Sequence, residues 1–423
     1  MTADSNAPAA GGRDLRALPK AHLHIHLEGA MRPGTMAELA ERDGVPVPLT
    51  RGYGSFAAFL EMYRAARQRV RSLEDLRRVV REVVEDAAAD GTVWIEPAFH
   101  PPNYRNLAPD SEVVVAVLEA GRMAARECHI GFGLMVAANR TTGPAEAENL
   151  ARLAASFADR GVVSFGLANE ENGYPPEQFA DAYRLARSAN LVAAPHAGEL
   201  SGPESVRSAL DALGADRVQH GIRSAEDPEL LRRLADEGTC LDVCPTSNVM
   251  LGVVPTLAQH PLPRLLAAGV RCSINADDPL LFGPGVLGEY ENCRASLGLD
   301  DSRLADLART SIEASGAPGD LKRAALGRIS AWTAMTRAVP DAVTGLARMV
   351  VENGHTLLLN QDGPGRDDAE ADHDRSRSGP VVRPDHDLAP RSSLRPRRGP
   401  DRRYGHAARP GRLHVWRRRL PAG

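Results

Sequence analysis

The stretch "AHLHIHLEG", residues 21–29, places a histidine at every second position three times and then a glutamate. Alternation with a period of two predicts a β-strand, because every second side chain of a strand lies on the same face. His22, His24 and His26 should therefore share one face of a strand. Neutral imidazole nitrogens are common metal ligands, so two of these rings could bind one ion if other strands supply the remaining ligands.

Seven further short apolar runs follow, and segments with helical periodicity lie between most of them. The runs are "GTVWIEPAFH" (91–100), "IGFGLMVAANR" (130–140), "GVVSFGLANE" (161–170), "LVAAPHAGE" (191–199), "RVQHG" (217–221), "TCLDVCPTSN" (239–248) and "GVRCSINADDP" (269–279). Eight strands that alternate with helices predict an α/β fold, the closed (β/α)₈ or TIM barrel. A doubly wound open sheet is the alternative, but no GxGxxG sequence follows the first strand.

Polar residues gather at the carboxyl end of nearly every run. They are His24, His26, Glu28, Glu96, Asn139, Asn169, Glu170, His196, Glu199, His220, Ser247, Asn248, Asp277 and Asp278. In a barrel these strand ends converge on one mouth, where active sites are built. Three histidines and one carboxylate from such ends would suit a hydrolytic Zn²⁺ site with room for water. Binding to Zn²⁺ lowers the pKa of water to about 7.

Composition sets the limits on the rest of the chain. The 423 residues carry a formal charge of -4, and the five cysteines form no CxxC pair, which favours reduced thiols in the cytoplasm. No secretory signal or membrane-spanning run is visible, and no nucleic-acid partner is expected. We expect a flexible N-terminus over 1–13, a barrel over 14–340, and a disordered tail rich in Arg, Pro and Asp over 341–423. A basic RNA-binding arm is the alternative for the tail.

Five motifs then make the sequence recognisable. "LPKAHLHIHLEGAMRP", "PHAGELSGP", "RVQHGIR", "CPTSN" and "INADDPLLFG" resemble, in this order, the adenosine deaminase family of metal-dependent hydrolases, over residues 14–335. The resemblance implies one Zn²⁺ bound by His24, His26, His196 and Asp277. His22 is expected to be a packed residue that supports the site and not a ligand.

The resemblance also implies how a purine would be bound and deaminated. Glu199 would protonate N1, His220 would orient a zinc-bound hydroxide towards C6, and Asp278 would contact N7. Loss of ammonia would leave a 6-oxopurine. His26, Glu28 and Asn169 would be the other substrate-binding residues, because their motifs contact the purine or its sugar side in the family.

Two departures from the family pattern concern the substrate. This chain has "HLEG" where nucleoside deaminases commonly have "HLDG", and "LANEE" where "LAGDE" is common, which places Glu28 and Asn169 on the sugar side. Both changes leave the metal and ring chemistry that the resemblance implies intact, so we expect a 6-aminopurine deaminase, first of all one that converts adenosine and water to inosine and ammonia. Aminodeoxyfutalosine deamination in menaquinone synthesis and adenine deamination are the alternatives, and a purine-binding barrel without turnover is the non-enzymatic one. The sequence indicates a small-molecule partner but no oligomeric state.

A segment inserted after the first expected strand has a helical pattern. In "GYGSFAAFLEMYRAA" (52–66), Phe56, Phe59, Leu60 and Tyr63 share one helical face, which either covers the mouth or packs on the barrel.

Two other classes of deaminase and hydrolase are disfavoured by the sequence. A two-metal site would need a lysine or bridging acid near the fourth strand, and the chain's lysines lie elsewhere. The cytosine deaminase pattern H-x-E…P-C-x-x-C is absent from the sequence.

Overall fold

The computed structural model describes residues 12–48, 53 and 55–335. The expected tail over 341–423, and all but two residues of the expected N-terminal segment, lie outside these residues. Among the helices that the structure describes, none is both long enough and apolar enough to cross a membrane.

Parallel strands form the centre of the described chain. They are β1 (Lys20–His22), β2 (Thr92–Ile95), β3 (Ala98–Phe99), β4 (Gly131–Phe132), β5 (Leu134–Asn139), β6 (Val162–Ala168), β7 (Val192–Ala197), β8 (Arg217–His220), β9 (Cys240–Val243) and β10 (Arg271–Ile274). Their order is β1-β2-β4 in one sheet and β10-β9-β8-β7-β6-β5-β3 in the other. Short breaks separate β2 from β3 and β4 from β5, so the ten labels correspond to eight barrel strands.

Backbone bonds beyond β1 and β10 close the barrel. The His26 N–H donates to Asp277 O at 2.9 Å, and the Asp277 N–H donates to His24 O at 3.1 Å. Parallel bridges join Ile25 to Asp277 and His26 to Ala98. The predicted (β/α)₈ barrel is therefore confirmed, and the "HLHIH" stretch bridges its two edges.

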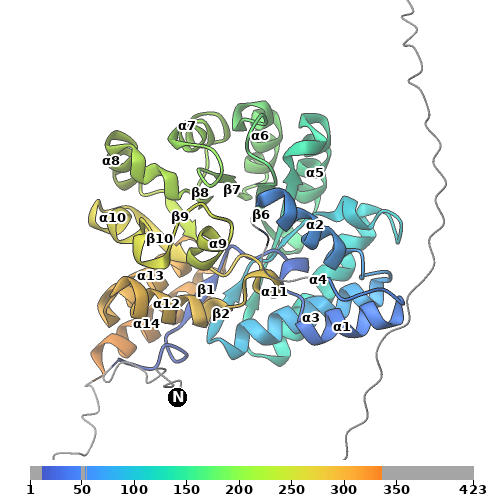
Figure 1. Cartoon of the computed structure of the whole chain (residues 1–423), viewed down its shortest axis with the longest axis horizontal. Helices are drawn as coiled ribbons and strands as arrows, with labels where there is room; N and C mark the ends of the chain where they lie inside the picture. The colour runs from blue at the N-terminus through green and yellow to red at the C-terminus, as the bar shows by residue number, and fades with distance from the viewer. Residues whose placement is uncertain (1–11, 49–52, 54, 336–423) are drawn as a thin grey trace, which may run out of the picture. The chain divides into compact units, whose positions relative to one another are not determined.

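Helices surround the strands in Figure 1. They are α1 (Pro33–Arg42), α2 (Phe56–Arg67), α3 (Leu73–Ala89), α4 (Asp110–Glu127), α5 (Pro144–Ser156), α6 (Ala180–Ser188), α7 (Pro203–Ser208), α8 (Pro228–Glu237), α9 (Pro245–Met250), α10 (Leu262–Ala267), α11 (Pro279–Phe282), α12 (Val286–Leu297), α13 (Asp301–Ala314) and α14 (Gly319–Ala334). In α3, Ser72 and Asp75 form a capping box, and an apolar stripe that includes Leu76 and Val80 is buried.

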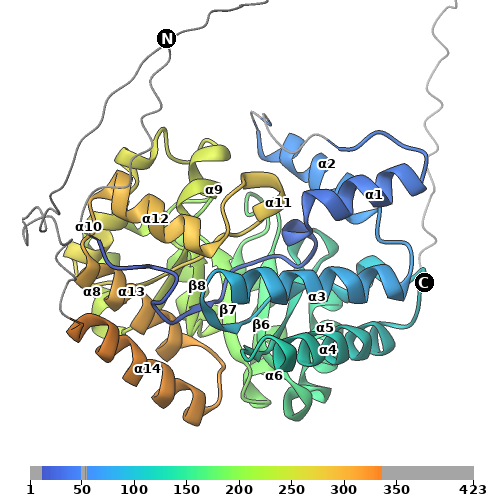
Figure 2. The ribbon, with the colours of Figure 1, turned by 90° about the horizontal axis from the view of Figure 1, so that it is seen from below.

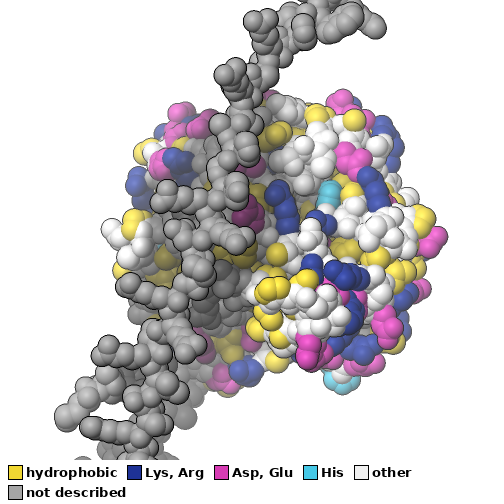
Figure 3. Space-filling model, turned by 45° about the vertical axis from the view of Figure 1, so that its right-hand side comes forward, with side chains coloured by type: hydrophobic (Ala, Val, Ile, Leu, Met, Phe, Trp, Pro, Cys, Tyr) yellow, Lys and Arg dark blue, Asp and Glu magenta, His cyan; other side chains and the backbone are white. Residues whose placement is uncertain are grey.

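The expected helical insertion after the first strand consists of α1 and α2. Figure 2 shows α2 on the same side of the barrel as α9 and α11, which follow β9 and β10. This is the side at which the strands end, so α2 lies at the mouth. On the face shown in Figure 3, Lys and Arg side chains are interspersed with Asp and Glu.

The opposite end of the barrel holds a buried ion-pair cluster. The Arg217 Nη2 donates to Glu96 Oε2 at 2.7 Å, and Arg217 Nε lies 3.3 Å from Asp242 Oδ2. The Trp94 indole also donates to Glu96, at 2.8 Å. The expectation that Glu96 lies at the mouth was wrong, because its strand runs on to Phe99 and Glu96 faces Arg217 at the start of β8.

Candidate metal and substrate site

The strand ends carry the predicted site residues. His24 and His26 follow β1, His196 lies near the end of β7, His220 ends β8, and Asp277 follows β10. His220 and Asp277 have φ angles of 61° and 60°. Side chains with a Cβ rarely adopt this left-handed conformation, and such strain is common at functional sites.

Four of these side chains meet within hydrogen-bonding distances. His24 Nε2 lies 3.1 Å from His196 Nε2 and 3.4 Å from Asp277 Oδ1, and His26 Nε2 lies 3.2 Å from the same oxygen. Asp277 belongs to two groups whose candidate ligand atoms all lie within 4.8 Å of one another. One group adds His24, His196 and His220, and the other adds His26 and Asp278.

The hydrogen bonds of Nδ1 in His24 and His196 show which ring nitrogen carries the hydrogen and which carries the lone pair. His24 Nδ1 lies 3.0 Å from Asp242 O, and His196 Nδ1 lies 3.0 Å from Leu167 O. A carbonyl accepts only, so each Nδ1 carries the hydrogen and each Nε2 carries a lone pair. Two lone pairs 3.1 Å apart beside a carboxylate are a favourable arrangement for a bound cation.

Asp277 is held as a carboxylate. The Ser247 hydroxyl donates to its Oδ2 at 2.6 Å. Burial alone would favour the protonated acid, but the surrounding His24 and His26 rings, when they carry a positive charge, hold the pKa of Asp277 well below its usual range. A charged oxygen therefore faces the imidazoles, as a metal ligand must.

Two further acids at the mouth have the opposite tendency. Burial, followed by the charge of Asp277, raises the pKa values of Glu199 and Asp278 well above their usual range. Glu199 Oε2 lies 3.4 Å from His220 Nε2. Among the described residues, Glu199 Oε1 and Asp278 Oδ1 have no hydrogen-bond partner. Both acids are thus suited to hold a proton and share it with a ligand.

Gly29 makes room for Asp278. A Cβ at Gly29 would lie 1.6 Å from Asp278 Oδ1, which no relaxation of a short side chain can accommodate. The glycine of "HLEG" and the second aspartate of "DDP" therefore occupy one space, although they are far apart in the sequence.

Glu28 lines a pocket at the mouth of the barrel together with Glu199 and Asp278. Its carboxylate accepts hydrogen bonds from the Tyr63 and Tyr104 hydroxyls, each at 3.0 Å, and lies 3.5 Å from Asn103 Nδ2. Burial and the charge of Glu28 raise the pKa values of both tyrosines, so both hydroxyls remain donors. Glu28 is not part of the metal cluster.

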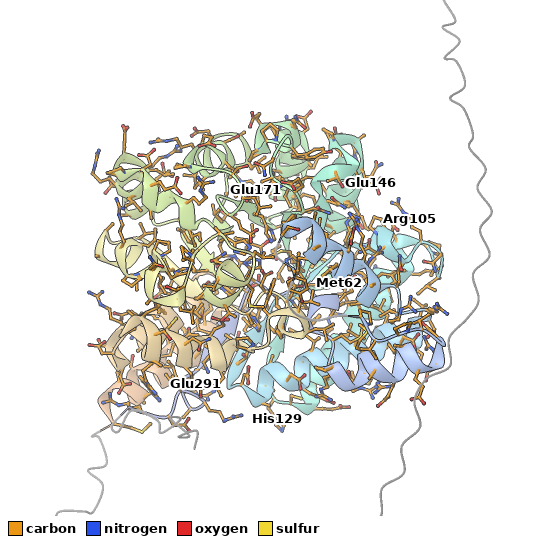
Figure 4. All side chains as sticks on the ribbon, viewed as in Figure 1. Met62, Arg105, His129, Glu146, Glu171 and Glu291 are labelled. Atoms are coloured by element: carbon orange, nitrogen blue, oxygen red, sulfur yellow. The ribbon has the colours of Figure 1, made fainter. Side chains whose placement is uncertain are left out.

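The inserted helix α2, marked by Met62 in Figure 4, contributes a wall of this pocket. Phe56, Phe59, Leu60 and Tyr63 all line it, together with the predicted site residues. The helical face predicted from the sequence is therefore the face towards the pocket. Aromatic side chains there can exclude water from a bound ring.

Asn169 lines the pocket with a φ of 84°. Glycine and asparagine are the residues that adopt this conformation most readily, so asparagine can replace the glycine of "LAGDE" without a change of backbone path. Glu170, which the sequence pattern also placed at the mouth, instead accepts a hydrogen bond from the Asn172 N–H at 3.0 Å.

The next residue, Glu171 (Figure 4), was missed by the sequence analysis. It accepts hydrogen bonds from the backbone N–H groups of Gly198, Glu199 and Ser201, at 3.1, 3.0 and 3.2 Å. The Ser205 hydroxyl donates to it at 3.0 Å. Glu171 thus holds the loop that presents Glu199, and only its place in "LANEEN" could have suggested this.

Other supporting residues were also missed. The Arg140 guanidinium donates to Tyr174 O at 2.9 Å and to His196 O, which fixes the end of β7. The His22 Nε2 accepts from the Ala276 N–H at 3.1 Å, next to Asp277. Burial lowers the pKa of His22 to about 3, so it is a neutral acceptor outside the cluster.

Known proteins resemble this chain over nearly all of the described barrel. A sequence model described as adenosine deaminase matches residues 19–332. A protein from Streptomyces coelicolor named putative adenosine/adenine deaminase is 44% identical over 339 residues, which cover 76% of this chain and 98% of that protein. The chain belongs to the adenosine deaminase family.

Solved structures agree with membership of the adenosine deaminase family. An adenine deaminase from Arthrobacter aurescens has a TM-score of 0.70 at 31% identity, over 74% of this chain and 99% of its own. An amidohydrolase from Burkholderia ambifaria, solved with bound zinc, has a TM-score of 0.70 at 30% identity, over 75% and 92%. The chain is a deaminase, a hydrolase that acts on carbon–nitrogen bonds.

Proposed function

We propose that this protein hydrolyses the 6-amino group of adenosine to give inosine and ammonia. The observation that supports this most directly is one pocket in which a His/Asp cluster, two proton-holding acids and an aromatic wall converge. His24, His26, His196 and Asp277 would hold one Zn²⁺. When bound, this ion would lower the pKa of water enough to make a nucleophile available near neutral pH.

The chain's own residues would then manage the protons. Glu199, with a raised pKa, would enter the reaction protonated and donate to N1 as C6 is attacked. His220 would orient the attacking water by a hydrogen bond. Asp278, also with a raised pKa, would share a proton with N7, which is an acceptor. Each of these acids has one oxygen without a partner among the described residues, as ligand recognition requires.

The sugar side of the pocket would be formed by Glu28 and Asn169. Glu28 keeps a free lone pair beside the hydrogen bonds from Tyr63 and Tyr104, and could accept from a ribose hydroxyl. The same acceptor could meet the N9 hydrogen of free adenine, so adenine remains an alternative substrate.

A substrate panel tests the proposal. The zinc-loaded protein is given adenosine, 2′-deoxyadenosine, adenine and aminodeoxyfutalosine in parallel, and ammonia release is measured. We expect the highest kcat/KM with adenosine, and no release from any substrate after chelation until Zn²⁺ is restored. Higher kcat/KM with adenine would contradict the substrate assignment, and no turnover of any of them would favour a binding protein.

One observation favours aminodeoxyfutalosine as a second candidate. Arg64 and Arg67 of α2 also line the pocket. Among the described residues, neither forms an ion pair with a carboxylate, whereas the nearby Arg105 pairs with Asp110 and Glu146, both at 2.6 Å. Unpaired guanidinium groups at a pocket rim suit a substrate that carries a carboxylate or phosphate away from the purine.

The double variant Arg64→Gln/Arg67→Gln separates these candidates. If aminodeoxyfutalosine is the substrate, its KM should rise at least tenfold in this variant while the KM for adenosine stays constant. An equal, small change for both substrates would remove the support from the arginines. Arg105→Gln is the matched control, because its charge is already paired.

Three other expectations stay predictions. They are the cytoplasmic location, the domain limits of 1–13, 14–340 and 341–423, and the single equivalent of zinc. Truncation after residue 340, followed by measurement of melting temperature and turnover, tests the domain limit nearest the site. We expect both to be unchanged.

A further inference from the structure

We propose that His260 and Asn248 are positioning residues that fix the tautomer of His220, so that its Nε2 carries a hydrogen and cannot bind the metal. The inference rests on the proposed function for its catalytic consequence. The hydrogen-bond pattern that carries it is independent of the substrate.

Distances alone leave two possible ligand sets for the metal. His220 lies close enough to His24, His196 and Asp277 to complete a four-ligand site. His26 Nε2 lies 3.2 Å from Asp277 Oδ1 and is the alternative fourth ligand, although the group whose ligand atoms all lie within 4.8 Å of one another contains His220 and not His26. A ligand must present a lone pair, so the position of the hydrogen on His220 decides between the two sets.

The hydrogen-bond chain begins at a backbone amide. The Leu262 N–H donates to His260 Nδ1 at 3.1 Å. Because a backbone N–H can only donate, His260 Nδ1 must carry the lone pair. Its hydrogen is therefore on Nε2. This ring is buried, and burial lowers the pKa of His260 to about 4, which agrees with a neutral acceptor.

The direction set by Leu262 is passed on through an amide side chain. His260 Nε2 lies 3.2 Å from Asn248, so its hydrogen must meet the carbonyl oxygen Oδ1. The amide nitrogen Nδ2 then faces His220 Nδ1 at 3.1 Å and donates to it. An amide orientation chosen from distances alone could be reversed, but here the backbone donor excludes the reverse.

His220 is consequently a single tautomer. Its Nδ1 accepts a hydrogen bond, which excludes both the Nδ1–H tautomer and the doubly protonated imidazolium. The hydrogen on Nε2 faces Glu199 Oε2 at 3.4 Å and Asp277 Oδ2 at 3.8 Å. A donor in this position can hold the attacking water by its oxygen, and it leaves His26 as the third imidazole ligand.

Two other rings of the cluster show the reverse pattern. His24 and His196 each direct Nδ1 towards a backbone carbonyl, so their hydrogens lie on the outside and their lone pairs face the cluster. These rings and His220 differ in the partner of Nδ1. A carbonyl oxygen at Nδ1 leaves a lone pair on Nε2 that can bind a metal, whereas an amide N–H at Nδ1 leaves a hydrogen on Nε2.

Burial makes the arrangement durable. Asn248 and His260 are 0% and 3% exposed, so water cannot replace either partner easily. The Val254 N–H also donates to Asn248 O at 3.0 Å, which ties the chain between α9 and α10 to the same residue.

Nitrogen NMR of the zinc-loaded full chain, labelled with ¹⁵N-histidine, tests the proposal directly. Long-range proton–nitrogen correlations distinguish the two neutral tautomers from imidazolium, and His220→Gln identifies the signals of His220. We expect the Nε2–H tautomer. An Nδ1–H tautomer or an imidazolium in the unmodified chain would overturn the proposal, whatever the enzyme's substrate proves to be.

Variants of Asn248 then test the consequence. In Asn248→Asp, the carboxylate can only accept, so His220 must direct a hydrogen from Nδ1 towards it. We expect the His220 signals to change, kcat to fall about 10- to 100-fold, and KM and zinc content to stay constant. Unchanged His220 signals and unchanged kcat in this variant would contradict the proposal.

His260 offers a conservative comparison that does not touch the reacting groups. A glutamine side chain at this position can still donate to Asn248 Oδ1, whereas a leucine cannot. We therefore expect His260→Gln to retain the His220 tautomer and His260→Leu to give a mixture of tautomers with a lower kcat. Equal tautomer populations in the two variants would overturn the role of His260. The exposed neighbour variant Gln259→Ala is the control and should behave as the unmodified chain.

Zinc content separates the two ligand sets. His220→Gln should keep one equivalent of zinc, and His26→Gln should lose it. The opposite result would place His220 in the metal site and overturn the proposal, while leaving the deaminase assignment intact.

Discussion

The two ends of the barrel bury acids in opposite ways. At the amino end, Glu96 and Asp242 lie beside Arg217, with indole, hydroxyl and backbone donors around them. At the carboxyl end, Glu199, Asp277 and Asp278 lie close together, and no described Arg or Lys pairs with any of them. The first arrangement satisfies its charges internally, and the second leaves them for a metal ion and a substrate.

The two ends of the barrel therefore differ in how they offset the cost of burying acids. Buried carboxylates without a cation destabilise a folded protein unless they are protonated. At the amino end, the Arg217 guanidinium offsets part of that cost, although burial still raises the pKa of Asp242. At the carboxyl end, the raised pKa values of Glu199 and Asp278 favour their protonated forms, and Asp277 is the acid that stays charged, as expected of a functional site.

The largest expected effect follows from a substitution at the carboxyl end of the barrel. Glu199→Gln keeps the shape of the side chain but removes the proton that N1 needs, so kcat should fall about 10²- to 10⁴-fold. Zinc content should stay at one equivalent, as measured by elemental analysis. Glu204→Gln, which changes an exposed residue in the first turn of the following helix α7, is the control with normal turnover. Near-normal turnover in the Glu199→Gln variant would remove Glu199 from the role of acid.

The second prediction concerns the ion-pair cluster at the amino end of the barrel. Arg217→Met leaves Glu96 and Asp242 buried without their cation, which should lower the free energy of unfolding by about 3–5 kcal/mol. Urea unfolding measures this loss, and kcat per folded molecule should not change. The surface variant Arg184→Met should leave stability as it is, because its pair with Asp181 is exposed. A loss of kcat without a loss of stability would contradict the proposed division between the two ends.

The third prediction concerns pH. Burial raises the pKa of Glu289 to about 8, although the Thr246 N–H donates to its carboxylate at 3.3 Å. Between pH 4.5 and 8 the folded state holds a proton that the unfolded state releases, so stability falls as pH rises, by up to about 1.4 kcal/mol per unit. Glu289→Gln should lack this slope in urea titrations at several pH values. A parallel pH dependence in both proteins would show that Glu289 is ionised throughout.

The smallest expected effect concerns the hydrogen bonds to Glu28 on the substrate side of the pocket. Tyr63→Phe removes one of the two hydroxyls that hold the Glu28 carboxylate, and Tyr104 remains. The loss of one such hydrogen bond should cost about 1 kcal/mol in substrate binding, or a rise in KM of about fivefold with kcat unchanged. Steady-state kinetics with adenosine measure it. A large fall in kcat would instead place Tyr63 in the reaction itself.

The barrel was predictable because its sequence pattern is periodic and recurs along the chain. Eight apolar runs with helical spacers leave few architectures, and the "HLHIH" stretch lies at the seam that closes the barrel. The misplacement of Glu96 shows the limit of this reasoning. An apolar run in the sequence does not show whether a strand ends at a polar residue or continues beyond it.

The supporting residues could not be predicted for a different reason. Glu171 acts on a loop 27 residues further on, and Leu262 acts on His220 through two intervening side chains. Neither contact leaves a local pattern, because hydrogen-bond direction depends on three-dimensional neighbours. The sequence could propose that four side chains converge, but the direction of each ring hydrogen required the structure.

The left-handed backbone at His220 and Asp277 has a consequence for engineering. Asparagine tolerates that conformation better than either residue, so asparagine at these positions would relax the main chain while ending turnover. An inactivated protein of this kind could outlast the working enzyme on heating. Selection for thermostability alone would therefore enrich inactive variants. Any such screen must also measure ammonia release.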